Sequence, residues 1–159
     1  MDLTKISGQI EHNFDEKLTR NLHGLRRLYH DQREIQRILK KNNPAVYEIF
    51  IKKQGKLNYS ITIINPGNIG VEYHMTHGYK HKQPTTALCV LVSGKGKLLI
   101  HDKTTEIIDL KQNKPVTIPK GSAHRLINTG KTRLKVLTVY NSKSEYDPFH
   151  KFETKVFAK

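Results

Sequence analysis

The chain contains one cysteine, no tryptophan and no apolar run long enough to cross a bilayer, which takes about 18 residues or more. The single thiol, Cys89, cannot form an internal disulfide and is typical of proteins in a reducing compartment. The first 17 residues are polar and include acids, unlike a secretory signal. These absences predict a cytoplasmic protein without a membrane segment.

Acidic residues are scarce: 28 Lys and Arg residues stand against 14 Asp and Glu residues, and the formal net charge is +14. Such a charge raises affinity for anions, including nucleic acids and phosphorylated small molecules. The lysines are scattered, however, and aromatic residues do not alternate with arginine as they do on a surface that stacks single-stranded bases. We therefore expect a phosphorylated small molecule, rather than nucleic acid, as the partner.

The sequence also lacks both a strand–helix–strand rhythm and the glycine pattern of a phosphate loop. From residue 45 onward, segments rich in β-branched and aromatic residues alternate with short turns. Short strands joined by short turns predict an antiparallel sandwich or barrel. The expected strands cover residues 45–52, 56–64, 71–76, 87–94, 96–101, 105–110, 115–119, 124–130 and 133–140. The tail, residues 144–159, is expected to add a further strand.

The region before these strands is expected to be partly helical. Residues 1–25 are read as an N-terminal arm, in which apolar residues recur at near-helical spacing but are interrupted by Gly24. Residues 26–159 are read as one domain, which suits a chain of this length. A short helix is predicted over residues 31–41, with Asp31 as its N-terminal cap.

A histidine cluster then raises the possibility of a metal site, because HMTHGYKH places His74, His77 and His81 within eight positions. The surrounding motifs read PGNIGVEYHMTHGYKH, GKG and PKGSAHRLINTG, in that order. They resemble the cupins, which are small double-stranded β-barrels, and more closely the archaeal-type glucose-6-phosphate isomerase family. The similarity runs from about residue 26 to residue 140. It implies a mainly β, cupin double-stranded barrel with a short N-terminal helical arm.

In that family two nearby histidines, a glutamate and a later histidine hold a divalent metal. Here the second histidine matches His81 and the late one matches His124, but Tyr79 stands in place of the first and Ala87 in place of the glutamate. The resemblance therefore implies a degenerate site for Fe, Zn, Mn or Ni, because two imidazoles alone leave a weak, open site. His74 is a candidate third ligand; the alternative is that His74 forms a hydrogen bond within the barrel.

The resemblance also implies a sugar-phosphate pocket, formed by family threonines, a glycine and tyrosines. The matching substrate-binding residues are Tyr47, Thr62, Thr76, Gly78 and Tyr140. Arg125 is a further candidate for an anionic ligand because it directly follows His124. If the chain is a catalyst, the residues placed to act are Tyr79, His81 and His124.

Three functions stay open at this stage. The chain could interconvert aldose and ketose phosphates, like the family that it resembles, although isomerisation needs a base and an oxyanion stabiliser. It could instead be a non-catalytic module that binds or senses a phosphosugar after losing its metal, or a cupin retooled for another biosynthetic step. A homodimer is expected by analogy with other cupins.

Overall fold

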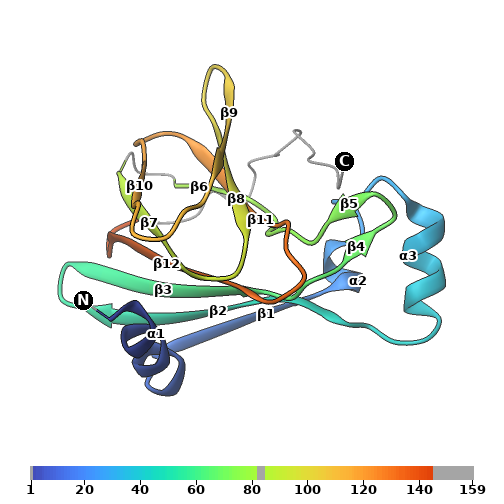
Figure 1. Cartoon of the computed structure of the whole chain (residues 1–159), viewed down its shortest axis with the longest axis horizontal. Coiled ribbons are helices and arrows are strands. Elements are labelled where there is room, and N and C mark those ends of the chain that lie inside the picture. The colour runs from blue at the N-terminus through green and yellow to red at the C-terminus, as the bar shows by residue number, and fades with distance from the viewer. Residues whose placement is uncertain (1, 82–84, 145–159) are drawn as a thin grey trace.

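In the computed structural model, which describes residues 2–81 and 85–144, two antiparallel sheets pack face to face around one core (Figure 1). The larger sheet has the strand order β1-β2-β3-β12-β7-β10, and the smaller sheet has the order β6-β11-β8-β9. The strands of the larger sheet are β1 (Glu16–Asn21), β2 (Ala45–Gln54), β3 (Leu57–Ile64), β12 (Leu134–Asn141), β7 (Ala87–Ser93) and β10 (Val116–Ile118). Those of the smaller sheet are β6 (Tyr79–Lys80), β11 (Ala123–Asn128), β8 (Gly96–His101) and β9 (Thr105–Asp109).

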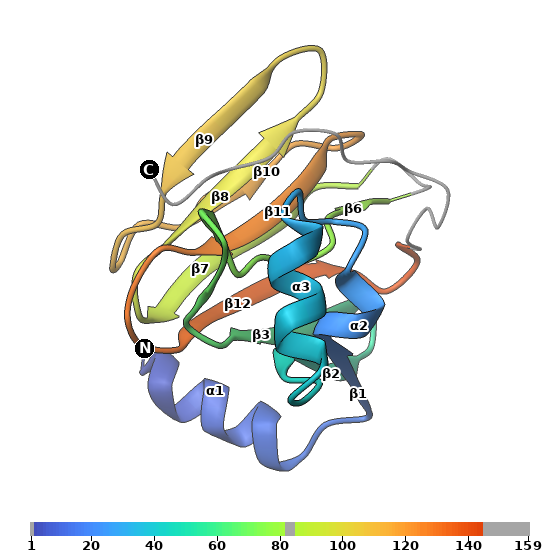
Figure 2. The ribbon, with the colours of Figure 1, turned by 90° about the vertical axis from the view of Figure 1, so that its right-hand side faces the viewer.

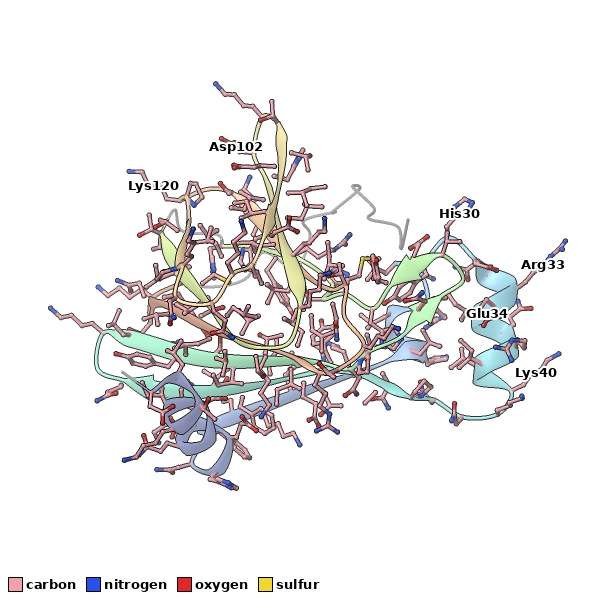
Figure 3. All side chains as sticks on the ribbon, in the orientation of Figure 1. His30, Arg33, Glu34, Lys40, Asp102 and Lys120 are labelled. Atoms are coloured by element: carbon pink, nitrogen blue, oxygen red, sulfur yellow. The ribbon has the colours of Figure 1, made fainter. Side chains whose placement is uncertain are left out.

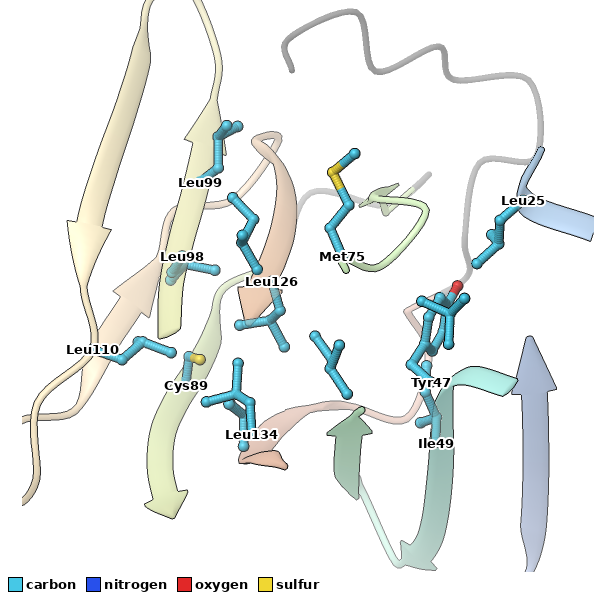
Figure 4. Close-up of a cluster of buried hydrophobic side chains, with 14 of the residues drawn as sticks. Leu25, Tyr47, Ile49, Met75, Cys89, Leu98, Leu99, Leu110, Leu126 and Leu134 are labelled. Carbon is cyan, nitrogen blue, oxygen red and sulfur yellow. The ribbon is translucent and has the colours of Figure 1, made fainter. Parts of the chain in front are cut away.

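The alternation of strand residues divides the apolar side chains between two clusters. On β7, Cys89 and Leu91 face the core between the sheets, whereas Val90 and Val92 face the outer side of the larger sheet. The core between the sheets is filled largely by Leu, Ile and Val side chains, and Figure 4 shows part of it, including Leu98 and Leu126 from the smaller sheet. Both faces of the larger sheet are therefore buried, which explains the continuous apolar runs in its central strands.

The outer face of the larger sheet is covered by α1 (Leu3–His12), as Figure 2 shows. Asp2 caps this helix by accepting hydrogen bonds from the backbone N–H groups of Thr4 and Lys5. Ile10 of the helix is buried in the outer apolar cluster. The short N-terminal helix is thus confirmed, and it packs on the barrel.

The segment before residue 26 differs in part from the expected helical arm. Residues 16–21 form strand β1, which pairs antiparallel with β2 along the edge of the larger sheet, and α2 (Leu22–Leu25) follows. The near-helical spacing of apolar residues was misleading here, because pairing with β2 satisfies the backbone of this segment. Leu18 instead packs toward the core from the inner face of β1.

The helix predicted at residue 31 is confirmed as α3 (Gln32–Leu39), with Asp31 accepting a hydrogen bond from Glu34 N at 2.9 Å. The charged side chains of Arg33 and Lys40 project outward from this helix (Figure 3). Of the predicted strand 71–76 only β5 (Glu72–Tyr73) is regular, and it pairs with β4 (Asn68–Ile69). No helix among residues 2–81 and 85–144 combines the length and apolar character needed to span a membrane. The strand predicted in the tail lies outside the described residues.

Candidate functional site

A small cavity of about 30 Å³ lies between the two sheets. This volume exceeds the roughly 10–15 Å³ that one water molecule needs. Ten residues line it: Ile49, Ser60, Thr62, Thr76, Tyr79, His81, His124, Leu126, Thr138 and Tyr140. Six of these side chains carry hydroxyl groups, two are imidazoles, and none of the ten carries a carboxylate.

Strand alternation explains why these hydroxyls converge. On β3, Ser60 and Thr62 point into the barrel, whereas Ile61 between them packs in the outer cluster under α1. Strand β12 pairs antiparallel with β3 in a register that sets Thr138 opposite Ser60. The same alternation on β12 brings Tyr140 to the cavity, two residues after Thr138.

The cavity collects six of the residues selected from the sequence: Thr62, Thr76, Tyr79, His81, His124 and Tyr140. Four other candidates, Tyr47, Gly78, Arg125 and His74, are not among its lining residues. Tyr47 lies next to the site, because its hydroxyl is 3.2 Å from that of Tyr79 and the two share a hydrogen bond. Tyr146 and His150, which could extend the site in the tail, lie outside the described residues.

Arg125 points away from the cavity because neighbouring residues of a strand face opposite sides. His124 and Leu126 line the cavity, and Arg125 lies between them in the chain. Its side chain is fully buried, and its Nη2 donates a hydrogen bond to the carbonyl of His77 at 2.8 Å. The sequence predicted that Arg125 contacts an anionic ligand because it follows His124. Its position next to His124 on the strand instead puts its guanidinium on the side of β11 that faces away from the cavity.

His74 also lies apart from the other two histidines. Its buried ring bonds through Nδ1 to the carbonyl of Asn65 at 3.0 Å, which matches the alternative of a hydrogen bond within the barrel. Strand β5 ends at Tyr73, so simple alternation does not continue from residue 72 to residue 76. Glu72 turns toward the helices instead and accepts a hydrogen bond from His30 N at 2.8 Å.

The two cavity histidines form a stacked pair, with ring centroids 5.8 Å apart and an interplanar angle of 30°. Burial lowers the pKa of His81. Burial, together with the neighbouring His81, lowers the pKa of His124 to about 3. Both imidazoles are therefore neutral at pH 7. The Nδ1 atom of His124 is buried and has no hydrogen-bond partner within the part of the chain that the structure describes.

These groups do not fit a divalent metal centre. Such an ion usually takes three or four nitrogen, oxygen or sulfur ligands from the protein. Residues 2–81 and 85–144 contain no group of three or more His, Cys, Asp and Glu side chains that could hold one. The cavity offers His81 and His124, with the phenol of Tyr79 beside them, and Ala87 has no ligating atom in its side chain.

Three residues that matter to the site were missed in the sequence. Ser60 and Thr138 add hydroxyls to the cavity wall, and alternation from Thr62 and Tyr140 was the signal that pointed to them. Asn128, at the end of β11, is fully buried and donates hydrogen bonds to the carbonyls of Ile64 and Thr132, both at 2.9 Å. Asn128 lies in the motif PKGSAHRLINTG, but the motif does not reveal its role, because its partners come from β3 and from the following turn.

Comparison with known proteins agrees with this architecture. The model of the family described as "Glucose-6-phosphate isomerase (GPI)" matches residues 19–156. The chain is 30% identical over 139 residues to glucose-6-phosphate isomerase of Pyrococcus abyssi, covering 83% of this chain and 74% of that protein. It is 31% identical over 139 residues to the enzyme of the same name from Thermococcus kodakarensis, covering 83% and 73%.

Solved structures support the fold alone, since their sequence identities are low. A cupin-2 domain from Rhodospirillum rubrum aligns with a TM-score of 0.50 at 13% identity, covering 63% of this chain and 62% of that one. Oxalate decarboxylase of Lactobacillus farciminis aligns with a TM-score of 0.51 at 18% identity, covering 60% of this chain and 28% of that one. The chain thus spans less than two thirds of each of these two structures. It has the cupin fold and belongs to the glucose-6-phosphate isomerase family, in its archaeal, cupin-type form.

Proposed function

We propose that this protein binds a phosphorylated sugar in the cavity between its sheets, without a metal ion. The observation that carries the proposal is the lining that residues 2–81 and 85–144 give the cavity: six hydroxyl side chains and two neutral imidazoles, with no carboxylate among them. Hydroxyls donate hydrogen bonds to phosphate oxygens and to sugar hydroxyls, and a carboxylate would repel the anion. The names of the relatives and the net charge of +14 support the same ligand class.

The size of the cavity sets a condition on binding. A pocket that encloses a small molecule usually measures about 300–1,000 Å³, whereas this one measures about 30 Å³. The walls must therefore move apart when a hexose phosphate enters. Strand β6 is the weakest part of the wall, because it pairs with β11 at only two positions, Lys80 with Ala123 and Tyr79 with His124.

Binding is favoured over rapid turnover by the chemistry of the lining. Aldose–ketose isomerisation moves a proton between adjacent carbons and needs a base whose pKa lies near the working pH. The described residues that line the cavity include no carboxylate, and burial lowers the pKa of His81 and of His124, so neither imidazole is a strong base. We therefore infer a carrier or sensor of a phosphosugar as the main function.

Isomerisation is a second candidate, favoured by one observation. His81 is neutral at pH 7 and lies tilted against the ring of Tyr140, at 5.8 Å between centroids, inside the cavity. In this reading the imidazole of His81 accepts the proton from the sugar carbon, and Tyr79 donates to the developing oxyanion. His124 completes the pair of nitrogen bases.

Calorimetric titration with glucose 6-phosphate and fructose 6-phosphate, compared with glucose, tests the binding proposal. Thr62→Val removes one cavity hydroxyl at nearly constant volume and should weaken phosphosugar binding by about tenfold or more, the usual effect of one hydrogen bond to a charged group. The matched control is Thr19→Val, on the exposed edge strand β1, which should leave affinity unchanged. Equal affinity for glucose and its phosphate, or equal effects of the two variants, would overturn the proposal.

Turnover and metal content separate the two candidates. For the main proposal, purified protein carries no stoichiometric divalent ion and gives no aldose–ketose interconversion with or without added Fe, Zn, Mn or Ni. Turnover that survives chelation and is abolished by His81→Ala would establish the second candidate. A tightly bound ion at one per chain would overturn the metal-free part of the proposal.

We also propose a homodimer in the cytoplasm. Within the part of the chain that the structure describes, strand β1 is paired on one side only, with β2, and such an edge offers backbone groups to a second copy. The only cysteine is a buried free thiol, as suits a reducing compartment. Light scattering that gives the mass of a single 18.4 kDa chain would contradict the dimer. Nucleic acid is not an expected partner, so binding to DNA should be weak at physiological salt.

A further inference from the structure

A buried arginine lies just outside the cavity. Arg125 is fully buried, and burying a guanidinium costs several kcal/mol unless charges and hydrogen bonds compensate for the lost water. Its electrostatic neighbours are the phenols of Tyr29 and Tyr47 and the carboxylate of Glu72. Burial lowers the pKa of Arg125 to about 10, so the side chain stays positively charged at pH 7. A retained buried charge of this kind calls for a structural or functional reason.

Arg125 begins a chain of hydrogen bonds that ends in the cavity. Its Nη2 donates to the carbonyl of His77 at 2.8 Å. The backbone N–H of His77 donates a hydrogen bond to the hydroxyl of Tyr47 at 3.3 Å. The Tyr47 hydroxyl then lies 3.2 Å from the hydroxyl of Tyr79, which lines the cavity. Because Tyr47 accepts from the His77 N–H, its own proton is available for Tyr79.

This series of hydrogen bonds is one of the contacts that position the phenol of Tyr79. Strand β6, which carries Tyr79, has two residues and lies at the edge of the smaller sheet. The preceding segment, residues 74–78, forms no regular strand apart from one isolated bridge at Met75. Tyr47, by contrast, is fully buried near the start of the ten-residue strand β2, where its backbone is paired with β1 on one side and β3 on the other. The Tyr47 hydroxyl therefore joins a short edge strand of the smaller sheet to a strand paired on both sides in the larger sheet.

We propose that Arg125 is a positioning residue for the ligand site: it holds the His77 backbone, and through it and Tyr47 it orients the phenol of Tyr79 in the cavity. This inference rests on the proposed function, because it assigns Tyr79 as a group that contacts the bound phosphosugar. It also explains why a charged side chain is kept on the face of β11 that does not reach the cavity.

The chain of contacts is tested first by ligand affinity. Arg125→Lys keeps the charge but loses the planar donor geometry, and Tyr47→Phe removes one hydroxyl from the chain. Each should weaken glucose 6-phosphate binding by about tenfold, as expected for losing one oriented hydrogen bond. In a Tyr79→Phe background, neither change should weaken binding further, because the group that they position is gone.

A control variant separates positioning from general packing. Tyr29→Phe removes a buried phenol hydroxyl beside the guanidinium of Arg125. Tyr29 takes no part in the hydrogen bonds that run from Arg125 to Tyr79, so this variant should bind glucose 6-phosphate within twofold of the wild-type affinity. If Arg125→Lys weakens binding equally in the wild-type and Tyr79→Phe backgrounds, its role is structural and the inference is wrong. If Arg125→Lys does not fold, Tyr47→Phe carries the same comparison.

A second readout needs no ligand. The protein has 7 tyrosines, 5 phenylalanines and no tryptophan, so near-ultraviolet circular dichroism reports mainly on tyrosines held in fixed surroundings. The Tyr79 contribution is the difference between the wild type and Tyr79→Phe. That difference should fall by at least half in the Arg125→Lys and Tyr47→Phe backgrounds and stay unchanged with Tyr29→Phe. An unchanged difference in all three would overturn the inference, whereas a reduced difference without phosphosugar binding would count against the proposed function alone.

Discussion

Replacement of Asn128 by aspartate should destabilise the protein far more than its small change in shape suggests. Asn128 is fully buried where β11 ends. Its Nδ2 donates to the carbonyls of Ile64 and Thr132, both at 2.9 Å, and its Oδ1 accepts from Gly130 N, also at 2.9 Å. Ile64 ends β3, in the other sheet. This one side chain therefore ties together the two strands that carry Thr62 and His124.

The size of the effect follows from these contacts. Asn128→Ala removes three hydrogen bonds, at a net cost of about 1 kcal/mol each, so the free energy of unfolding should fall by about 3 kcal/mol. In a domain of this size that corresponds to a drop in the melting temperature of about 6–12 °C. Asn128→Asp turns two donors into acceptors facing carbonyl oxygens and buries a charge, and we expect a loss of about 3–5 kcal/mol.

Urea denaturation followed by circular dichroism measures both losses, with Asn141→Asp as the control. Asn141 is exposed at the end of β12, and its Oδ1 accepts from Lys143 N at 2.9 Å, so an aspartate there keeps the bond and should cost less than about 0.5 kcal/mol. The buried aspartate should have a raised pKa, so its penalty should shrink as the pH falls from 7 toward 5. A loss at position 128 no larger than that of the control would refute the reasoning.

Two further stability changes follow from the same structure. Glu11 accepts hydrogen bonds from Lys135 and Ser7 at 2.8 and 2.7 Å; burial alone would raise the pKa of Glu11, but these two partners lower it. Glu11→Gln should therefore cost about 1 kcal/mol at pH 7 in urea denaturation, and the difference should be lost as the pH falls through the lowered folded-state pKa of Glu11, below 4.5. Gly94 has a φ of +89°, and an added Cβ would lie 2.4 Å from the Arg133 carbonyl oxygen, so Gly94→Ala should lower the melting temperature by about 4–10 °C. Unchanged thermal unfolding of Gly94→Ala would show that the turn can relax.

The strands were predictable from the sequence because burial on both faces leaves a strong local signal. The segments 56–64 and 133–140 are rich in β-branched residues and are largely buried on both faces, and each forms one strand within two residues of its expected limits. Residues 16–21 were not predictable in the same way. Their apolar spacing was near-helical, and only the long-range pairing with β2 made them a strand.

For the site, the prediction came from the family resemblance, which selected Thr62, His81 and His124. These three residues lie on or beside strands whose register brings them to one cavity. Alternation failed between residues 72 and 76, where the chain leaves β5 and turns, so His74 bonds to Asn65 instead. The prediction that Arg125 contacts an anionic ligand was wrong, because Arg125 follows the cavity residue His124 and consecutive residues of a strand face opposite sides.

The same alternation separates the stability of this barrel from the chemistry of its cavity. On β3 the inward residues Ser60 and Thr62 are polar and line the site, while the outward residues Ile61 and Ile63 are buried against α1. Much of the transfer free energy of the strand thus comes from side chains that lie outside the cavity. Substitutions on the inner face can therefore alter the chemistry of the cavity while the fold remains. The inner face presents six hydroxyl side chains around a space of about 30 Å³, which would have to widen to hold the phosphosugar that we propose.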